Sequence, residues 1–426
     1  MSQVKILCRV NEADSFKIND NYIDYNINQN NIFTYTFWNK KLLHLPNFFT
    51  KTALDMLYIS LFVYGADRII PRDSTDDCWT RNFKLYIPVL DKDAWVKNKK
   101  LLEAMLCFLS GDSWEIEFRQ RELTKREKEY KNSIEVNKNK IDFNEVCMFS
   151  GGLDSFIGAI DLLEDNLERD ILFVSHYGGG KGVKEFQDIL RNKLIKKYNL
   201  MENNFYSFYA SAKKGVEETT RTRSFMFFSH AVVLASSSKK TVKLIVPENG
   251  LISLNIPLTS SRLGSSSTRT THPYYLSMFQ ELLNNLKLDV NITNPYQFKT
   301  KGEMIKGCSN IEFLRKNIIN TMSCSHPFLY GETDTCHCGY CLPCVIRRAA
   351  ILKAGIKDDT RYRDVDFTSK DIAKVNYSSY MLGLKKFDKK RAFLNIQKAG
   401  PIKTDLEKFT DLYIRGMNEL KTFLED

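Results

Sequence analysis

The middle of the chain alternates two hydrophobic patterns. Short, nearly continuous apolar runs indicate strands that are covered on both faces, and the stretches between them repeat apolar residues with the period of a helix. Such alternation predicts an α/β fold with a doubly wound parallel sheet and helices on both faces. The expected strands are 145–149, 170–175, 205–210 and 242–246, and the expected helices are 155–163, 183–197 and 224–236.

The residues before this unit mix strand and helix signals. Residues 52–64 are rich in Leu, Ala, Ile and Phe and predict a helix, whereas 83–89 and 114–118 alternate apolar and polar side chains like strands. Residues 122–140 are strongly charged and lack apolar periodicity, which is typical of an exposed helix or linker. We therefore expect an N-terminal α+β accessory module over 1–140.

Two further divisions follow from length and pattern. A chain of 426 residues is longer than one core usually supports, so two or three domains are expected. We assign 141–355 to the parallel-sheet domain together with a cysteine-rich segment. Residues 356–426 are expected to form a helical C-terminal tail, with 406–423 as its clearest helix.

Composition narrows the class of protein. Apolar residues at 43% and charged residues at 27% are ordinary for a globular chain and exclude disorder. The net charge of +11 is compatible with nucleic-acid binding, but Asp and Glu interrupt every basic run, so that function is not favoured. There is no leader-like N-terminus and no run of eighteen apolar residues, and we expect a cytoplasmic protein without a membrane span.

The segment Ser150-Gly151-Gly152-Leu153-Asp154-Ser155 directly follows the first predicted strand and precedes a helix. The two glycines let backbone N–H groups approach an anion, the helix N-terminus adds a positive dipole end, and both serines offer hydroxyls. A turn that uses glycine only for geometry is the alternative. The pattern indicates a phosphate-binding loop.

Polar residues follow two other predicted strands. His176, Tyr177 and Gly178 come after the second strand, and Glu248, Asn249 and Gly250 come after the fourth. Ligands of doubly wound sheets bind at the carboxyl ends of the strands, so we expect these residues to contact nucleotide or substrate. Arg269 to His272 offer a cation, hydroxyls and an imidazole, a set that suits a carboxylate or phosphate, although an ordinary surface loop is nearly as compatible with it.

Half of the ten cysteines lie close together near the end of the predicted sheet domain. Cys338, Cys341 and Cys344 form a CxxCxxC motif and Cys324 lies fourteen positions before it, a set that can close a tetrahedral zinc site of structural type. An iron–sulfur cluster is the alternative. Nearby spare ligands are Cys336, His337 and His326.

The string SGGLDS at 150–155 matches the PP-loop of the N-type ATP pyrophosphatases, and with the cysteine motif it resembles the 7-cyano-7-deazaguanine synthase (QueC) family over residues 142–350. Residues 300–305 are similar to a T-K-x-E-I segment of that family. The resemblance implies ATP cleavage to AMP and pyrophosphate with Mg²⁺, adenylation of a 7-deazaguanine carboxylate, and catalytic roles for Asp154, Ser155 and Lys301.

The extra N-terminal region and tail look like the QueC-like proteins of bacterial anti-phage operons, among them QatC of the Qat system. For that group the resemblance implies transfer of the activated carboxylate to an amine of a partner protein from the same operon, with the N-terminal module as the docking site. Three alternatives stay open: a nitrile synthase of queuosine biosynthesis, a tRNA-modifying PP-loop enzyme, and a nucleotide-sensing regulator without turnover.

Overall fold

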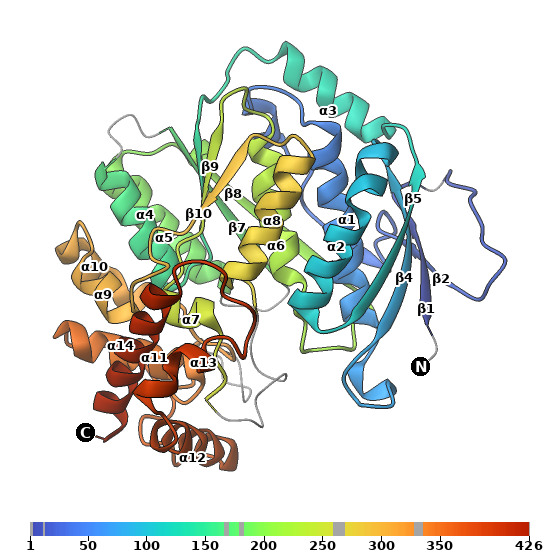
Figure 1. The fold of residues 1–426 in the computed structure, drawn as a ribbon. Helices are drawn as coiled ribbons and strands as arrows, with labels where there is room; N and C mark the ends of the chain where they lie inside the picture. The colour runs from blue at the N-terminus through green and yellow to red at the C-terminus, as the bar shows by residue number, and fades with distance from the viewer. Residues whose placement is uncertain are drawn as a thin grey trace.

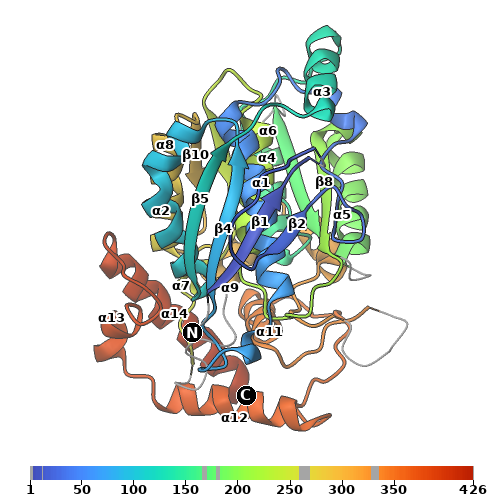
Figure 2. The same cartoon turned by 90° about the vertical axis from the view of Figure 1, so that its right-hand side faces the viewer.

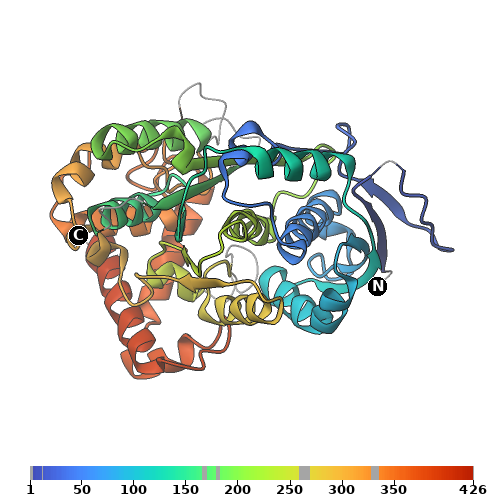
Figure 3. The ribbon, with the colours of Figure 1, turned by 90° about the horizontal axis from the view of Figure 1, so that it is seen from above.

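The computed structural model describes residues 3–11, 13–165, 170–178, 183–258, 269–327 and 335–425. Two parallel sheets stand side by side, and helices cover and separate them (Figure 1). The two ends of the chain lie at opposite ends of the molecule (Figure 3). Within the described part of the chain, no helix combines the length and the apolar character needed to cross a membrane.

The larger sheet has six strands in the order β10-β9-β6-β7-β8-β3. The chain moves from β6 through β7 to β8 on one side, then returns to place β9 and β10 on the other, so the winding direction switches between β6 and β9. The predicted parallel α/β sheet is confirmed. The strands are β6 (Glu145–Met148), β7 (Ile171–Tyr177), β8 (Phe205–Ala212), β9 (Val242–Ile245), β10 (Val290–Thr293) and the antiparallel edge strand β3 (Phe33–Tyr35).

Helices pack on both faces of this sheet because its strands are apolar on both faces. Leu172 and Val174 of β7 belong to one core, and Phe173 between them belongs to the other. The Phe173 face is covered by α4 (Leu153–Asp165) and α5 (Val183–Tyr198). The opposite face is covered by α6 (Arg223–Ala235), α8 (Pro273–Asn285) and α1 (Lys51–Ile69).

The N-terminal sheet departs from the expected α+β arrangement, because all of its strand pairs are parallel in the order β2-β1-β4-β5. Helix α2 (Lys92–Ser110) carries the chain back from β4 to β5, and such a crossover makes the two strands run in the same direction. Figure 2 shows this sheet beside the larger one. Its strands are β1 (Val4–Arg9), β2 (Ile23–Asn26), β4 (Asn82–Val89) and β5 (Ser113–Gln120).

The N-terminal region shares its core with the larger sheet. Strand β3 pairs with β8, and α1 packs on α6 within one apolar cluster that extends from Ile6 to Val290. The charged stretch after β5 forms the predicted exposed helix, α3 (Lys125–Val136). The proposed boundary at residue 140 stays a prediction, since an extensive shared core joins the residues on its two sides.

Four buried charged side chains, called the junction network below, lie where the two sheets meet. Asp112 is 3.0 Å from Arg72 and 2.8 Å from Arg81, and Arg81 also pairs with Asp67 at 2.5 Å. The second oxygen of Asp67 accepts hydrogen bonds from the backbone N–H groups at the start of α6. The network therefore joins the end of α1, the start of β4 and the N-terminus of α6.

Residues 301–327 and 335–425, with the short helix at 250–254, form a helical layer under the carboxyl edge of the larger sheet. Apolar residues of 304–318 join the core on the Phe173 face, and most of the others share a separate apolar core. The layer includes the predicted tail helix, α14. The helices are α7 (Gly250–Leu254), α9 (Lys301–Lys306), α10 (Ile311–Asn317), α11 (Leu342–Ala354), α12 (Asp371–Lys385), α13 (Ala392–Asn395) and α14 (Leu406–Glu425). Short 3-10 turns occur at Lys40–His44, Arg72–Ser74, Glu202–Asn204, Ile318–Asn320 and Lys389–Arg391.

Candidate functional site

The predicted phosphate loop, residues 150–155, connects β6 to α4 at the switch point of the larger sheet. Gly151 has φ +83°, and a Cβ there would lie 2.9 Å from Cγ of Gln187, so both backbone and space require glycine. The hydroxyls of Ser150 and Ser155 are 3.2 Å apart. Ser150 is exposed, whereas Ser155 is buried and its hydroxyl donates to the Gly152 carbonyl at 3.0 Å. The loop therefore presents the Ser150 hydroxyl to solvent beside the N-terminus of α4.

Gln187 on α5 holds the loop from one side, and the sequence reasoning missed it. Its Nε2 donates to the Ser150 carbonyl at 3.0 Å and to the His176 carbonyl at 3.2 Å. A signal exists in the sequence: Gln187 occupies the buried stripe that continues through Leu190 and Leu194, where an apolar residue is expected. A polar residue at a buried position of such a stripe is expected to hydrogen-bond with a neighbouring segment.

Asp154 is the centre of a polar cluster that we call the site group, which consists of the buried Asp154, Asn249 and Lys301 and the half-buried Glu248. One Asp154 oxygen lies 2.8 Å from Nζ of Lys301, and the other accepts from the backbone and side-chain nitrogens of Asn249 at 3.1 and 2.7 Å. Burial opposes ionisation, but Lys301 and the hydrogen bonds from Glu248 and Asn249 outweigh it and lower the pKa of Asp154 to about 2. Residues from three separate predicted segments thus meet here.

Glu248 behaves in the opposite way. Burial, followed by the neighbouring charge of Asp154, raises the pKa of Glu248 well above its ordinary value. Its carboxyl group also lies 3.2 Å from Nδ2 of Asn249. The pKa values of the two carboxyl groups thus shift in opposite directions, and of the two, Glu248 takes up a proton more readily, at the carboxyl edge of β9.

Lys301 owes its position to the start of α9 and to the C-terminal helix. Thr300 caps α9 in a reciprocal pair with Glu303, and Nε of Arg415 on α14 lies 2.7 Å from Glu303. The Thr300 hydroxyl also donates to Glu419 of α14. Lys301 is only 5% exposed. The tail helix therefore supports the residue that pairs with Asp154, a connection for which the sequence gives no local signal.

The predicted residues at the end of β7 form no hydrogen bond or ion pair with the described residues of the site group. The His176 ring lies against α6, 6.1 Å from the ring of His230 between centroids, and burial, followed by the charges of His230 and Arg223, lowers its pKa well below the ordinary value. Tyr177 lies beside Tyr209 at 5.5 Å. A Cβ on Gly178 would meet no atom within 4 Å. Contact of these residues with a nucleotide stays a prediction.

Gly250 has a packing role that the structure makes plain. Its N–H donates to the Lys299 carbonyl at 2.9 Å, and a Cβ there would lie 2.2 Å from the carbonyl oxygen of Gln297. Only glycine allows α7 to start so close to this segment. Asn249 caps the same helix through Oδ1, which accepts from the N–H of Ile252 at 3.1 Å. Gly250 thereby fixes Asn249 relative to Asp154.

The four predicted metal ligands converge. The Sγ atoms of Cys324, Cys338, Cys341 and Cys344 all lie within 4.8 Å of one another, with 3.9 Å between the first and third and between the second and fourth. A tetrahedral zinc with four thiolates, at the usual Zn–S length, separates its sulfurs by about 3.8 Å, so the site fits zinc. His337 accepts from the Ser323 N–H through Nε2 at 3.2 Å and is not a member of the cluster.

The cysteine cluster is linked to the phosphate loop through the two residues that precede Cys324. The Met322 N–H donates to the Gly151 carbonyl at 2.9 Å, and the Leu153 N–H approaches the Ser323 hydroxyl at 3.5 Å. These two residues immediately precede Cys324. A metal that fixes Cys324 would therefore restrain the segment on which the loop rests.

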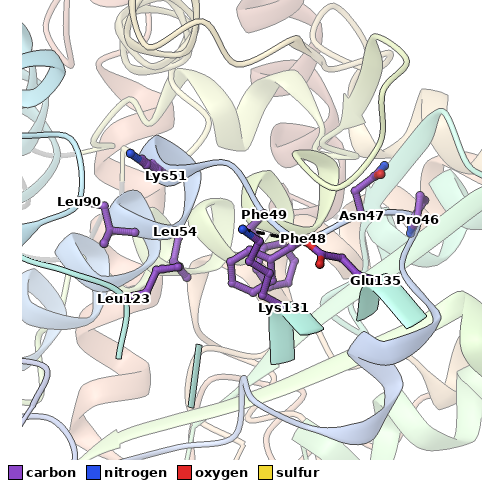
Figure 4. A pocket seen from close by; sticks show the side chains of 10 residues that line it. All are labelled: Pro46, Asn47, Phe48, Phe49, Lys51, Leu54, Leu90, Leu123, Lys131 and Glu135. Atoms are coloured by element: carbon purple, nitrogen blue, oxygen red, sulfur yellow. Dashed lines mark ion pairs between the residues drawn. The ribbon is translucent and has the colours of Figure 1, made fainter. Parts of the chain in front are cut away.

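A separate hollow of about 400 Å³ lies between the start of α1 and α3 (Figure 4). Its rim carries an ion pair between Lys131 and Glu135. Its lining contains no residue of the phosphate loop, the site group or the cysteine cluster, so this hollow is not the predicted nucleotide site. The lining residues are Pro46, Asn47, Phe48, Phe49, Lys51, Leu54, Leu90, Leu123, Lys131 and Glu135.

The parallel α/β sheet carries the SGGLDS loop at its switch point and a four-cysteine cluster near its carboxyl edge, and distant homology suggests the class of PP-loop enzymes that use ATP. In agreement, the chain is similar to 7-cyano-7-deazaguanine synthase of Methanococcus aeolicus, with 24% identity over 245 residues that cover 51% of this chain and 98% of that protein. This is distant homology over half of the chain. No family model matches the sequence.

Proposed function

We propose that the protein is an AMP-forming ligase that adenylates a 7-deazaguanine carboxylate and transfers it to an amine of a partner protein in anti-phage defence. The observation that carries the proposal is the phosphate loop at the switch point, with the buried Asp154–Lys301 pair at the first turn of α4. The similarity to a 7-cyano-7-deazaguanine synthase supports a deazaguanine substrate.

The proposed reaction has two steps. The substrate carboxylate attacks the α-phosphorus of ATP, pyrophosphate leaves, and an acyl adenylate forms. The amine then attacks the acyl carbon, AMP leaves, the amine loses a proton and an amide results. Positioned N–H groups and hydroxyls at residues 150–155 would hold the departing pyrophosphate, so the loop contributes mainly by orientation and charge stabilisation.

The site group supplies the remaining polar functions in this proposal. Ionised Asp154 and the Ser155 hydroxyl are hard oxygen ligands of the kind that suit Mg²⁺, which neutralises phosphate charge when bound with ATP. Glu248 offers its carboxyl oxygens to the N–H edge of the base. Lys301 keeps Asp154 ionised and adds positive charge beside the loop.

A protein acceptor is supported by the part of the chain that lies outside the match. The similarity covers 98% of the relative but 51% of this chain, so about half of this protein has no counterpart there. In our proposal the N-terminal sheet docks the partner and presents its amine, such as an N-terminus, to the adenylate.

Product analysis tests the proposal. Full-length protein is incubated with α-labelled ATP, magnesium and 7-carboxy-7-deazaguanine, with and without the proteins encoded beside it, and partner masses are measured intact. We expect AMP and a deazaguanine-sized addition to a partner. A nitrile product would indicate the synthase reaction, and AMP formed only with tRNA would indicate tRNA modification. ADP as the only product, or no turnover under any condition, would contradict the proposal.

A further inference from the structure

Two arginines near the junction network form no ion pair with a carboxylate among the residues that the structure describes. Within that network Arg72 and Arg81 are matched by Asp67 and Asp112. Arg221 and Arg269 lie next to it. Burial, followed by the charges of Arg72 and Arg269, lowers the pKa of Arg221 to about 10. The buried Glu217, which accepts from the Arg72 N–H at 2.8 Å, is the third carboxylate here. Four arginines thus face three carboxylates, which leaves one positive charge in excess.

Arg221 is the more unusual of the two. It is only 7% exposed, and its guanidinium forms neither a hydrogen bond nor an ion pair with any described residue. Asp67 accepts from its backbone N–H at 2.8 Å and not from its side chain. The guanidinium lies over the Trp79 ring at 4.6 Å, on which Arg72 also lies at 4.8 Å.

Arg269 is placed in a similar way. Its guanidinium lies 4.7 Å from the centre of the Phe108 ring, and Nη1 donates to the Phe108 carbonyl at 2.8 Å. Arg269 has no ion pair with a described residue, and burial lowers its pKa. Both guanidiniums are therefore held against aromatic rings, which fixes their planes and leaves N–H groups for another acceptor.

Both arginines lie at the carboxyl edge of the larger sheet. Arg221 lies between β8 and α6, and Arg269 lies between α7 and α8. The segment with Arg269 connects to the site group, because the Ser253 hydroxyl is 3.1 Å from the Thr271 hydroxyl and 3.1 Å from the Asn249 carbonyl. The arginine pair and the phosphate loop are therefore separate features of one edge, where ligands of such sheets bind.

We propose that Arg221 and Arg269 form a second oxyanion site, which binds a carboxylate or phosphate group of a small molecule. A buried cation without a partner is strongly unfavourable, and a bound oxyanion restores the charge balance. The planar N–H fork of arginine matches the two oxygens of a carboxylate or phosphate. An anion can bind there whichever reaction the phosphate loop carries out.

The test uses thermal unfolding of the full chain at constant ionic strength with sodium phosphate, sodium pyrophosphate or 7-carboxy-7-deazaguanine. We expect at least one of them to raise the Tm of the wild type and of Ser155→Ala, a loop variant. Without ligand, Arg221→Gln should have a Tm equal to or above that of the wild type. Its affinity for the ligand, obtained from the rise in Tm, should be at least tenfold lower. A rise in Tm with phosphate or pyrophosphate identifies a phosphate group as the bound oxyanion, and a rise with 7-carboxy-7-deazaguanine identifies a carboxylate.

Arg223→Gln is the matched control, because Arg223 is an exposed neighbour whose loss changes the net charge equally. It should keep the response. Arg269→Gln should weaken binding, and so should Arg221→Lys, which keeps the positive charge but not the planar N–H fork. These two variants decide the test if Arg221→Gln does not fold. The proposal is overturned if no probe raises the Tm of the wild type, if Arg221→Gln responds like the wild type, or if only loop variants lose the response.

Discussion

The protein buries two groups of charges that differ in balance. The junction network sets two arginines against two aspartates, and both oxygens of Asp67 and of Asp112 accept hydrogen bonds. The site group sets two carboxyl groups, Asp154 and Glu248, against Lys301 alone, and burial together with the charge of Asp154 raises the pKa of Glu248. A closed, balanced network suits structural support, whereas an unbalanced group beside the phosphate loop is what a binding or catalytic site requires.

The largest expected effect comes from removing a zinc ligand. The residues that contact the phosphate loop, Met322 and Ser323, directly precede the ligand Cys324, whereas the junction network does not include the cysteine cluster. Cys338→Ser should lose the bound zinc, whose binding free energy is on the order of 10 kcal/mol in small zinc domains. Metal analysis and hydrogen exchange should show an unoccupied site and lost protection at residues 321–324. Cys336→Ser is the neighbouring control and should keep its zinc. Full metal content in Cys338→Ser would disprove the ligand assignment.

The next effect tests the structural role of the junction network. Arg81→Gln leaves Asp67 and Asp112 buried with one arginine fewer, which should cost about 3–5 kcal/mol of unfolding free energy. Urea denaturation measures this. Arg126→Gln, an exposed arginine on α3, should change stability by less than about 0.5 kcal/mol. Equal unfolding free energies of Arg81→Gln and Arg126→Gln would contradict a structural role of the junction network.

Strain in the phosphate loop gives a smaller effect. Gly151→Ala places a side chain at φ +83° and against Gln187, so we expect a loss of about 1–3 kcal/mol and weaker ATP binding. Gly178→Ala is the matched control, since a Cβ there meets nothing within 4 Å. Calorimetric unfolding and ATP titration compare the two. An unchanged Gly151→Ala protein would argue against a rigid loop.

The smallest effect concerns pH. Because the folded pKa of Glu248 is raised, its stabilisation is complete below the ordinary value of 4.5 and is lost as the pH rises through the folded value. Asp154 acts oppositely: its stabilisation is present above 3.8 and is lost as the pH falls toward about 2. Glu248→Gln should therefore gain stability relative to the wild type as pH rises, by about 1.4 kcal/mol per unit at most.

Urea titrations between pH 4 and pH 9 measure the difference, and Glu129→Gln, an exposed substitution of the same type, serves as the control. Parallel pH profiles of wild type and Glu248→Gln would show that Glu248 titrates as it does in the unfolded chain. That result would contradict a raised pKa of Glu248 beside Asp154.

Local patterns were enough to predict four strands of the larger sheet, β6 to β9, the helices α4, α5 and α6, the loop at 150–155 and the four cysteines. Strands β3 and β10 and helix α8 were not predicted. Local patterns were not enough for contacts between distant residues. Strand β3 pairs with β8 across about 175 residues, and an alternating pattern carries no strand direction, so the N-terminal sheet was assigned wrongly as α+β. The support of α9 by Arg415 likewise depends on tertiary packing alone.

The pairing of the site residues shows the same limit. The sequence placed Glu248 and Asn249 at a sheet edge and Asp154 in the loop, but the ion pair with Lys301 joins positions 147 apart. Arg221 carried no signal at all, because its lack of a partner appears only when the junction network is complete.

Exchange of labelled pyrophosphate into ATP tests the central claim most directly, because it reports reversible adenylate formation without requiring the acceptor. Wild-type protein with ATP, magnesium and 7-carboxy-7-deazaguanine should incorporate label, and Asp154→Asn should lower the rate at least about a hundredfold while keeping its fold. Exchange that does not depend on the carboxylate, or that Asp154→Asn retains in full, would contradict an adenylating site at this loop.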